Sequence, residues 1–179
     1  MSHGRMYVFS NLPLTEYERQ SIYEQVTEEK VPSTYDYVSG DLVFDAELQN
    51  FLENHPHLNH DGKKFDVSLG EALNDAKETH YFPTPSGNEM VDFLRFKYHY
   101  RYGKWSWESF VIVNKYEEDS FEWTWDINLF DALVAAYHYS EMSHATRYGQ
   151  NPRVEQGIVP LDLNFRYDLM LEDVYDYHY

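Results

Sequence analysis

Apolar residues recur with the 3.6-residue period of an amphipathic helix in four stretches of the chain. The four stretches are residues 14–30, 45–54, 68–78 and 128–139. The first opens with Thr15 and Glu18 at the spacing of a capping box, and we expect its Ile22, Tyr23 and Val26 to face the core. The last stretch is the most apolar, so we expect it to pack directly on a sheet.

A period of two residues marks the strands. Residues 93–115 alternate around Gly103 and Lys104, a pair suited to a two-residue hairpin turn, and residues 120–127 repeat the pattern after a turn at residues 117–119. Two further strands are predicted at residues 5–12 and 160–167. The predicted fold class is therefore α+β: a three- to four-stranded antiparallel sheet with a central β-hairpin at about residues 93–115, covered by amphipathic acidic helices.

The 179 residues fit a single domain spanning 1–179. Hydrophobic residues make up 42% and aromatic residues 18% of the chain, which is too apolar for a disordered acidic polypeptide. Residues 168–179 are expected to form an acidic, tyrosine-rich tail, and its order is left open. A helical tail would align Asp168, Glu172 and Asp176 in one row. In an extended tail, Tyr175, Tyr177 and Tyr179 would instead occupy alternate positions along the strand.

The net charge of the chain is the feature that bears most directly on its partners. Asp and Glu total 31 against 14 Lys and Arg, a formal net charge of −17, which repels nucleic acid and anionic membranes. Three explanations compete: solubility, life in high salt, and attraction of a partner built to hold polyanions. The absence of cysteine excludes disulfides and thiol catalysis and fits a reducing cytosol. No signal peptide or bilayer-spanning run is found, so we expect a cytoplasmic protein.

One basic island interrupts the acidic chain. Arg95, Lys97, His99 and Arg101 fall on one face of the predicted hairpin, opposite an aromatic face. Such a hairpin could serve as a nucleic-acid platform, or its basic face could pair with carboxylates inside the fold. The surrounding negative charge favours internal pairing.

The acids of the predicted helices form rows, because side chains at i and i+4 stand about 5–6 Å apart on one face. Rows of this spacing are comparable to the phosphates of a DNA strand. The carboxylates that we expect to imitate phosphates are Glu16, Glu24, Glu28, Glu71, Asp75, Glu78, Asp168, Glu172, Asp173 and Asp176. Tyrosine suits wet interfaces, and there are 17 in the chain; the tail residues Tyr175, Tyr177 and Tyr179 are the expected aromatic contacts.

A second chemistry is suggested by His55, His57, His60 and Asp61, since imidazole and carboxylate are ligands of first-row metals. Their spacing loosely resembles the HxHxDH motif of metallo-β-lactamase-like hydrolases, but the spacing and order of the second His and the Asp differ. We favour a turn with exposed histidines. No nucleophile elbow or phosphate-binding loop occurs, so neither catalysis nor a cofactor is expected.

Small size, absence of cysteine, strong acidity, aromatic richness and helical acid rows together resemble phage and plasmid proteins that imitate DNA, including antirestriction and anti-CRISPR inhibitors. The resemblance covers composition over the whole chain. It implies an inhibitor in a bacterial host cell that occupies the basic DNA or RNA channel of a restriction complex, a CRISPR nuclease or RNA polymerase. The alternatives are a small metal-dependent hydrolase and a generic acidic adaptor protein, and homodimerisation is left open.

Overall fold

A computed structural model describes residues 3–34, 37–39, 42–79, 108–126, 128–137 and 162–178. The α+β class is confirmed. In chain order the labelled elements are β1 (His3–Ser10), α1 (Glu16–Thr34), β2 (Tyr37–Ser39), α2 (Phe44–Asn54), β3 (His60–Asp61), β4 (Lys64–Ser68), α3 (Leu69–Thr79), β5 (Glu108–Glu117), β6 (Ser120–Asp126) and β7 (Arg166–His178). A further helix covers residues 129–137. All four predicted helices are present.

The described strands form one seven-stranded mixed sheet, which is larger than the predicted three to four strands. Its order is β3-β4-β7-β1-β5-β6, and β2 also pairs with β7. The pairing of β1 with β5 is parallel, whereas β7 runs antiparallel to β1, β2 and β4. A parallel neighbour is allowed here because a long crossover containing α1, α2 and α3 separates β1 from β5.

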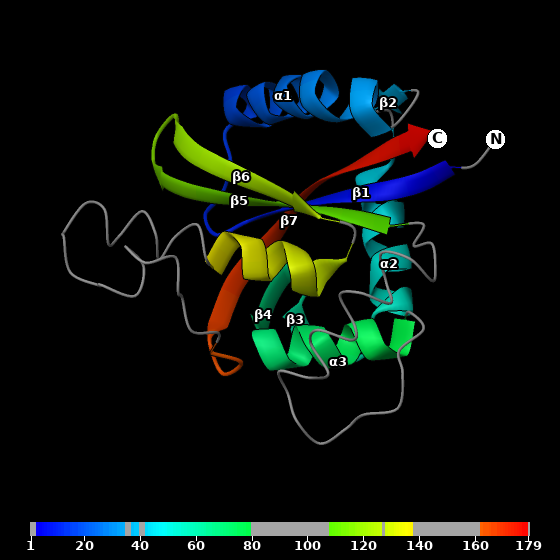
Figure 1. The fold of residues 1–179 in the computed structure, drawn as a ribbon, viewed down its shortest axis with the longest axis vertical. Coiled ribbons are helices and arrows are strands. Elements are labelled where there is room, and N and C mark those ends of the chain that lie inside the picture. Colours follow the sequence, from blue (N-terminus) through cyan, green and yellow to red (C-terminus); the bar gives the residue numbers. More distant parts are fainter. Residues whose placement is uncertain are drawn as a thin grey trace.

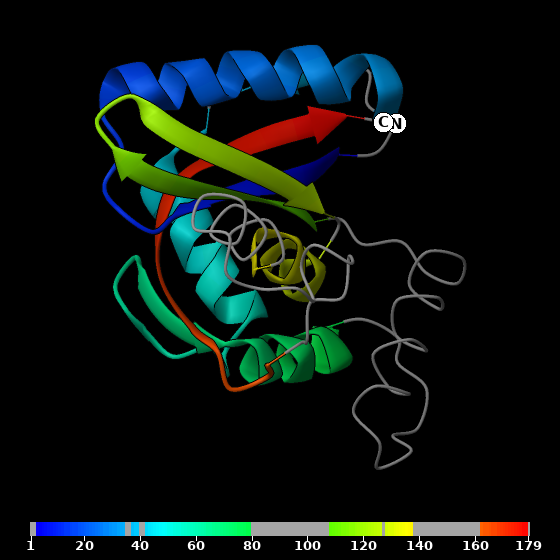
Figure 2. The ribbon, with the colours of Figure 1, turned by 60° about the vertical axis from the view of Figure 1, so that its left-hand side comes forward.

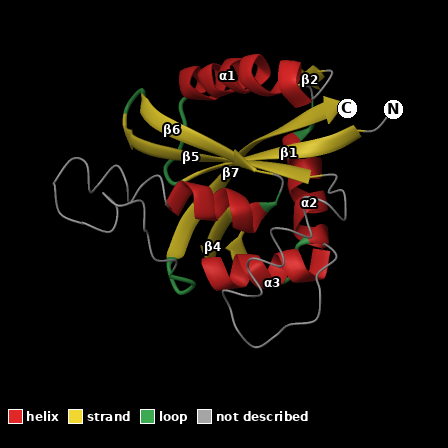
Figure 3. Cartoon of the chain, viewed as in Figure 1, coloured by secondary structure: helices red, strands yellow, loops and turns green. Residues whose placement is uncertain are grey.

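Helices cover both faces of this sheet (Figures 1 and 3). Of the described helices, α1 lies on one face, while α2, α3 and the 129–137 helix lie on the other. Alternation along β1 supplies both cores: Met6 and Val8 pack in the α1 cluster, and Tyr7 and Phe9 in the opposite cluster. Strand β1 therefore buries both faces, which explains its run of apolar residues from Met6 to Phe9.

The predicted hairpin lies only partly within the described chain, because residues 93–107 fall outside it. Its described second half belongs to β5, which is buried on both faces and not on one as expected: Val111 packs toward α1, and Phe110 and Ile112 toward the other helices. A hairpin does follow, where β5 pairs antiparallel with β6. The predicted turn at residues 117–119 and the strand after it are confirmed, and Asp119 has a positive φ of 60° in this turn.

The expected tail is a central strand. Strand β7 runs beside β1 for most of its length, and His178 pairs with His3, so the two ends of the described chain meet (Figure 2). A register shift between Val8 and Phe9 of β1 makes a bulge in β7 around Glu172. Because a bulge adds one residue to one strand, Glu172 and Asp173 both fall on the α1 side. The extended alternative for residues 168–178 is the one found.

Candidate partner-binding surface

The solvent face of α1 carries a row of carboxylates. Glu16, Glu24 and Glu28 are all exposed, and Gln20 donates a hydrogen bond from Nε2 to Glu24 Oε1 at 3.1 Å. The opposite side of the helix is buried, with Ile22 and Val26 fully inside the core, as the 3.6-residue pattern predicted. The predicted row on α1 is therefore available to a partner. We call Glu16, Tyr17, Gln20, Glu24 and Glu28 the α1 stripe.

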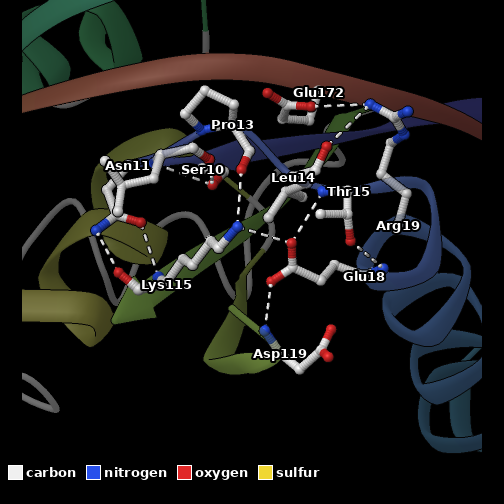
Figure 4. Close-up of polar contacts among 11 residues, drawn as sticks. Ser10, Asn11, Pro13, Leu14, Thr15, Glu18, Arg19, Lys115, Asp119 and Glu172 are labelled. Atoms are coloured by element: carbon white, nitrogen blue, oxygen red, sulfur yellow. Dashed lines mark hydrogen bonds and ion pairs between the residues drawn. The ribbon is translucent and has the colours of Figure 1, made fainter. Parts of the chain in front are cut away.

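The beginning of α1 is fixed by the predicted capping box (Figure 4). Thr15 N donates to Glu18 Oε1 at 2.9 Å, and Glu18 N donates to Thr15 Oγ1 at 3.1 Å. The Glu18 carboxylate is fully buried. It also accepts from Lys115 Nζ at 2.8 Å and from Asp119 N at 3.3 Å. One carboxylate thus joins the first turn of α1 to β5 and to the β5–β6 turn.

This buried carboxylate stays ionised. Burial alone would raise the pKa of Glu18, but the hydrogen bonds from Lys115 and Thr15 lower its pKa below the usual value. Lys115 Nζ further donates to Pro13 O at 3.1 Å, and Asn11 exchanges two hydrogen bonds with the Lys115 backbone. The segment leading into α1 is therefore held rigidly against β5.

A second ion pair holds α1 to β7. Arg19 Nη1 lies 3.3 Å from Glu172 Oε2, and the Glu172 side chain is only 2% exposed. Its Oε1 has no hydrogen-bond partner among the residues that the structure describes. Burial raises the pKa of Glu172, with partial opposition from Lys63 and Arg19. Burial likewise raises the pKa of the neighbouring Asp173. Glu172 is thus part of the α1–sheet interface and is not available to a partner.

The other residues predicted in β7 divide by face. Asp168 is exposed and Asp176 half-buried, with Asp176 accepting a hydrogen bond from Arg5 Nη1 at 3.0 Å. Tyr175 and Tyr177 are 1% and 2% exposed beneath α1. Their expected role as surface contacts is therefore wrong, because the strand's alternation turns both rings into the core. Tyr179 lies outside the described residues.

On α3 the expected acid row is also broken. Glu71 caps its own helix in a box with Ser68 and accepts from Arg166 Nη1 at 3.2 Å. Asp75 is only 3% exposed, so the expectation that it faces solvent is wrong. The side chain of Glu78 lies outside the described part of the chain. The surface predicted on α3 is therefore largely used within the fold.

Asp75 is buried because it meets His55, at the end of α2. Its two carboxylate oxygens lie 2.8 and 2.9 Å from His55 Nδ1, and Glu108 Oε2 lies 2.7 Å from His55 Nε2. The imidazole also stacks on Phe51, with ring centroids 4.4 Å apart. Burial alone would lower the pKa of His55, but its hydrogen bonds to the carboxylates of Asp75 and Glu108, and their negative charge, raise the pKa to about 9. This charged histidine ties α2 and α3 to β5.

The predicted histidine cluster is therefore dispersed. His55 is 1% exposed inside this network, whereas His57, His60 and Asp61 are exposed. Among the described residues, no group of three or more His, Asp or Glu side chains is placed to hold a metal ion. The geometry gives the hydrolase alternative no support.

A cavity of about 410 Å³ lies on the sheet near β3, β4 and β7. Its lining includes Asn11, His60, Asp61, Asp66 and Asp168. Asp66 and Asp168 face each other across the β4–β7 ladder, and Arg166 Nε donates to Asp66 Oδ1 at 2.8 Å. The predicted carboxylate Asp168 of β7 thus lines this cavity.

Sequence reasoning missed two features of this surface. Tyr17 is 69% exposed on the α1 stripe, and Glu117, Glu118 and Asp119 are exposed on the β5–β6 turn. The turn lies beside the start of α1 (Figures 1 and 2). Tyr17 precedes Glu24 by seven residues, a two-turn spacing that could have placed both on one side of the helix. The approach of the turn depends on tertiary contacts with Glu18.

Searches of protein-family models, curated proteins and solved structures found no match to this chain. No helix within the described ranges combines the length and apolar character needed to cross a bilayer. The class defined so far is an α+β protein with a mixed sheet and an acidic outer helix.

Proposed function

We propose that this protein is an acidic DNA mimic that inhibits a bacterial nucleic-acid-binding enzyme by occupying its basic channel with the α1 stripe. The proposal is supported mainly by one observation: Glu16, Glu24 and Glu28 face solvent from one helix, and none of them enters an ion pair among the described residues. At about 1.5 Å of rise per residue, their spacings are about 12 and 6 Å along the axis. Phosphates on one DNA strand advance by about 3.4 Å each, so the shorter spacing is close to two phosphate steps and the longer one falls between three and four.

The described cations support the same proposal. Arg5 pairs with Glu47 and Asp176, Arg19 with Glu172, and Lys115 with Glu18. These cations neutralise carboxylates that hold elements of the fold together. Among the described residues, no cation therefore pairs with the carboxylates of the α1 stripe, which favours attraction of a basic groove from a distance.

The target classes are a restriction complex, a CRISPR nuclease and RNA polymerase. Each purified enzyme is to be mixed with labelled duplex DNA, and displacement of the DNA by the protein measured at 0.1 M and 0.5 M salt, where the Debye length shortens from about 10 Å to about 4 Å. We expect displacement from at least one enzyme, weakened at the higher salt. A pull-down from bacterial lysate with duplex DNA as competitor extends the search beyond this panel.

Matched variants separate a binding surface from net charge. The stripe variant carries Glu16→Gln, Glu24→Gln and Glu28→Gln, and the control carries Asp45→Asn, Glu53→Gln and Asp162→Asn at exposed positions elsewhere. Both lose three negative charges. At about 0.2–1 kcal/mol per exposed pair, the stripe variant should inhibit roughly tenfold less well, and the control less than twofold. Equal weakening by both variants, or failure to displace DNA from any captured or panel enzyme, would refute the proposal.

A further inference from the structure

We infer that Tyr17 makes the α1 stripe selective for arginine over lysine on the partner, an inference that rests on the proposed function. Tyr17 has the largest exposed fraction, 69%, of any aromatic side chain in the described part of the chain. By contrast, Tyr7, Tyr175 and Tyr177 are at most 2% exposed. These tyrosines belong to the core, whereas the ring of Tyr17 is presented to solvent.

The ring shares its side of α1 with the carboxylates. Tyr17 lies seven residues before Glu24 and eleven before Glu28, which are close to two and three helical turns. The buried residues Glu18 and Ile22 point the other way, into the sheet. A partner that docks on the carboxylates of the stripe therefore also meets the tyrosine ring.

The platform beneath this ring is rigid. The adjacent Glu18 is fixed by the capping box, by Lys115 and by the backbone of Asp119 (Figure 4). Arg19 N donates to Thr15 O at 3.0 Å, and its side chain reaches Glu172. A contact on a preorganised helix loses less conformational entropy than one on a mobile loop, and a tyrosine ring itself has only two side-chain torsions to order.

The chemistry of this surface distinguishes the two cations. A guanidinium is planar and weakly hydrated, so it can stack on an aromatic face while its N–H groups bond carboxylates; an ammonium is compact and strongly hydrated. The partner that fits is therefore an arginine-bearing segment of a basic groove. A second copy of this chain does not fit, because two bodies of net charge −17 repel each other.

The test uses two defined probes, nona-arginine and nona-lysine peptides, whose affinities for the full-length protein are compared by titration calorimetry at about 0.15 M salt. Any acidic protein can prefer one peptide to some degree, so the measured quantity is the ratio of the two affinities in each variant. Tyr17→Ala should reduce the wild-type preference for nona-arginine by about threefold. Tyr17→Phe, which keeps the ring face, should retain it. Alanine is a strong helix former, so the substitution is compatible with α1.

The charge variants distinguish failure of this inference from failure of the proposed function. The triple Glu→Gln stripe variant should weaken both peptides while keeping the arginine-to-lysine ratio. If Tyr17→Ala keeps the wild-type ratio, the inference is overturned and the proposed function stands. If the stripe variant binds both peptides as well as the Asp45, Glu53 and Asp162 control does, the stripe is not the binding surface, and both are overturned.

Discussion

Stability between pH 6.5 and 9 should depend on one buried histidine. His55 sits between Asp75 and Glu108, with its two ring nitrogens 2.7–2.9 Å from their carboxylates. Its pKa is raised from 6.5 to about 9. A histidine with a raised pKa contributes its full stabilisation below the unfolded value and loses it as the pH rises through the folded value. The window is therefore pH 6.5 to 9, with the loss on the alkaline side.

The magnitude follows from the same shift. The folded and unfolded pKa values of His55 differ by about 2.5. At about 1.4 kcal/mol for one pKa unit, this difference corresponds to about 3 kcal/mol of folding free energy. For a domain of this size, that is a large part of the 5–15 kcal/mol typical of folding. Deprotonation leaves two carboxylates around a neutral ring, and one ring nitrogen can no longer donate a hydrogen bond.

The assay is urea unfolding of the wild type, His55→Gln and His60→Gln at pH 6, 7.5 and 9.5. We expect the free energy of unfolding of the wild type to fall by about 3 kcal/mol across this range. His55→Gln should be less stable at pH 6 and nearly independent of pH. His60 is exposed, so its variant should follow the wild type. A flat wild-type profile, or an unchanged slope in His55→Gln, would refute the reasoning.

Three further substitutions test the contacts around α1 and the β5–β6 turn. Glu18→Gln removes the charge facing Lys115 and should lower the free energy of unfolding, measured with denaturant at pH 7, by about 2–3 kcal/mol. Because the pKa of Glu18 is lowered, the difference from the wild type should disappear as the pH falls through that lowered pKa. Glu172→Gln should be at least as stable as the wild type at pH 7 in the same assay, since burial raises the pKa of Glu172 and opposes its ionised form; a clear loss of stability would contradict this. Asp119→Val should lower the thermal midpoint through a loss of about 1–2 kcal/mol, because a β-branched residue disfavours the positive φ of 60°, whereas Asp119→Asn should be neutral.

The sequence allowed prediction of the elements whose pattern is local. The four helices, β1, the turn at residues 117–119 and β6 follow from apolar periodicity and a capping box. Strand β7 was missed as a central strand because its acids and tyrosines look like a surface tail. Those acids are compensated by Arg5 and Arg19, which lie 171 and 153 residues away in sequence. No local pattern contains that pairing.

The same limit explains the fate of the predicted sites. The predicted exposure of Glu16, Glu24 and Glu28 was confirmed, because exposure on a helix follows from the helix's own 3.6-residue period. The prediction that Asp75 faces solvent was wrong, because its burial depends on His55, 20 residues away in sequence, and on Glu108 of strand β5. The favoured prediction of a turn with exposed histidines holds for His57 and His60 and is wrong for His55, which lies between these two carboxylates.

The distribution of charge on α1 bears on why the chain is acidic. Surfaces that serve solubility usually intersperse both signs. From Glu16 to Glu28 the only cation in the sequence is Arg19, and it forms an ion pair with the buried Glu172. Like charges at i and i+4 cost a few tenths of a kcal/mol for each pair, so Glu24 and Glu28 are retained side by side at a small cost in stability. A helical segment, residues 16–28, whose one cation is paired within the fold and whose acids are displayed together with an exposed tyrosine is better explained by a basic partner than by solubility alone.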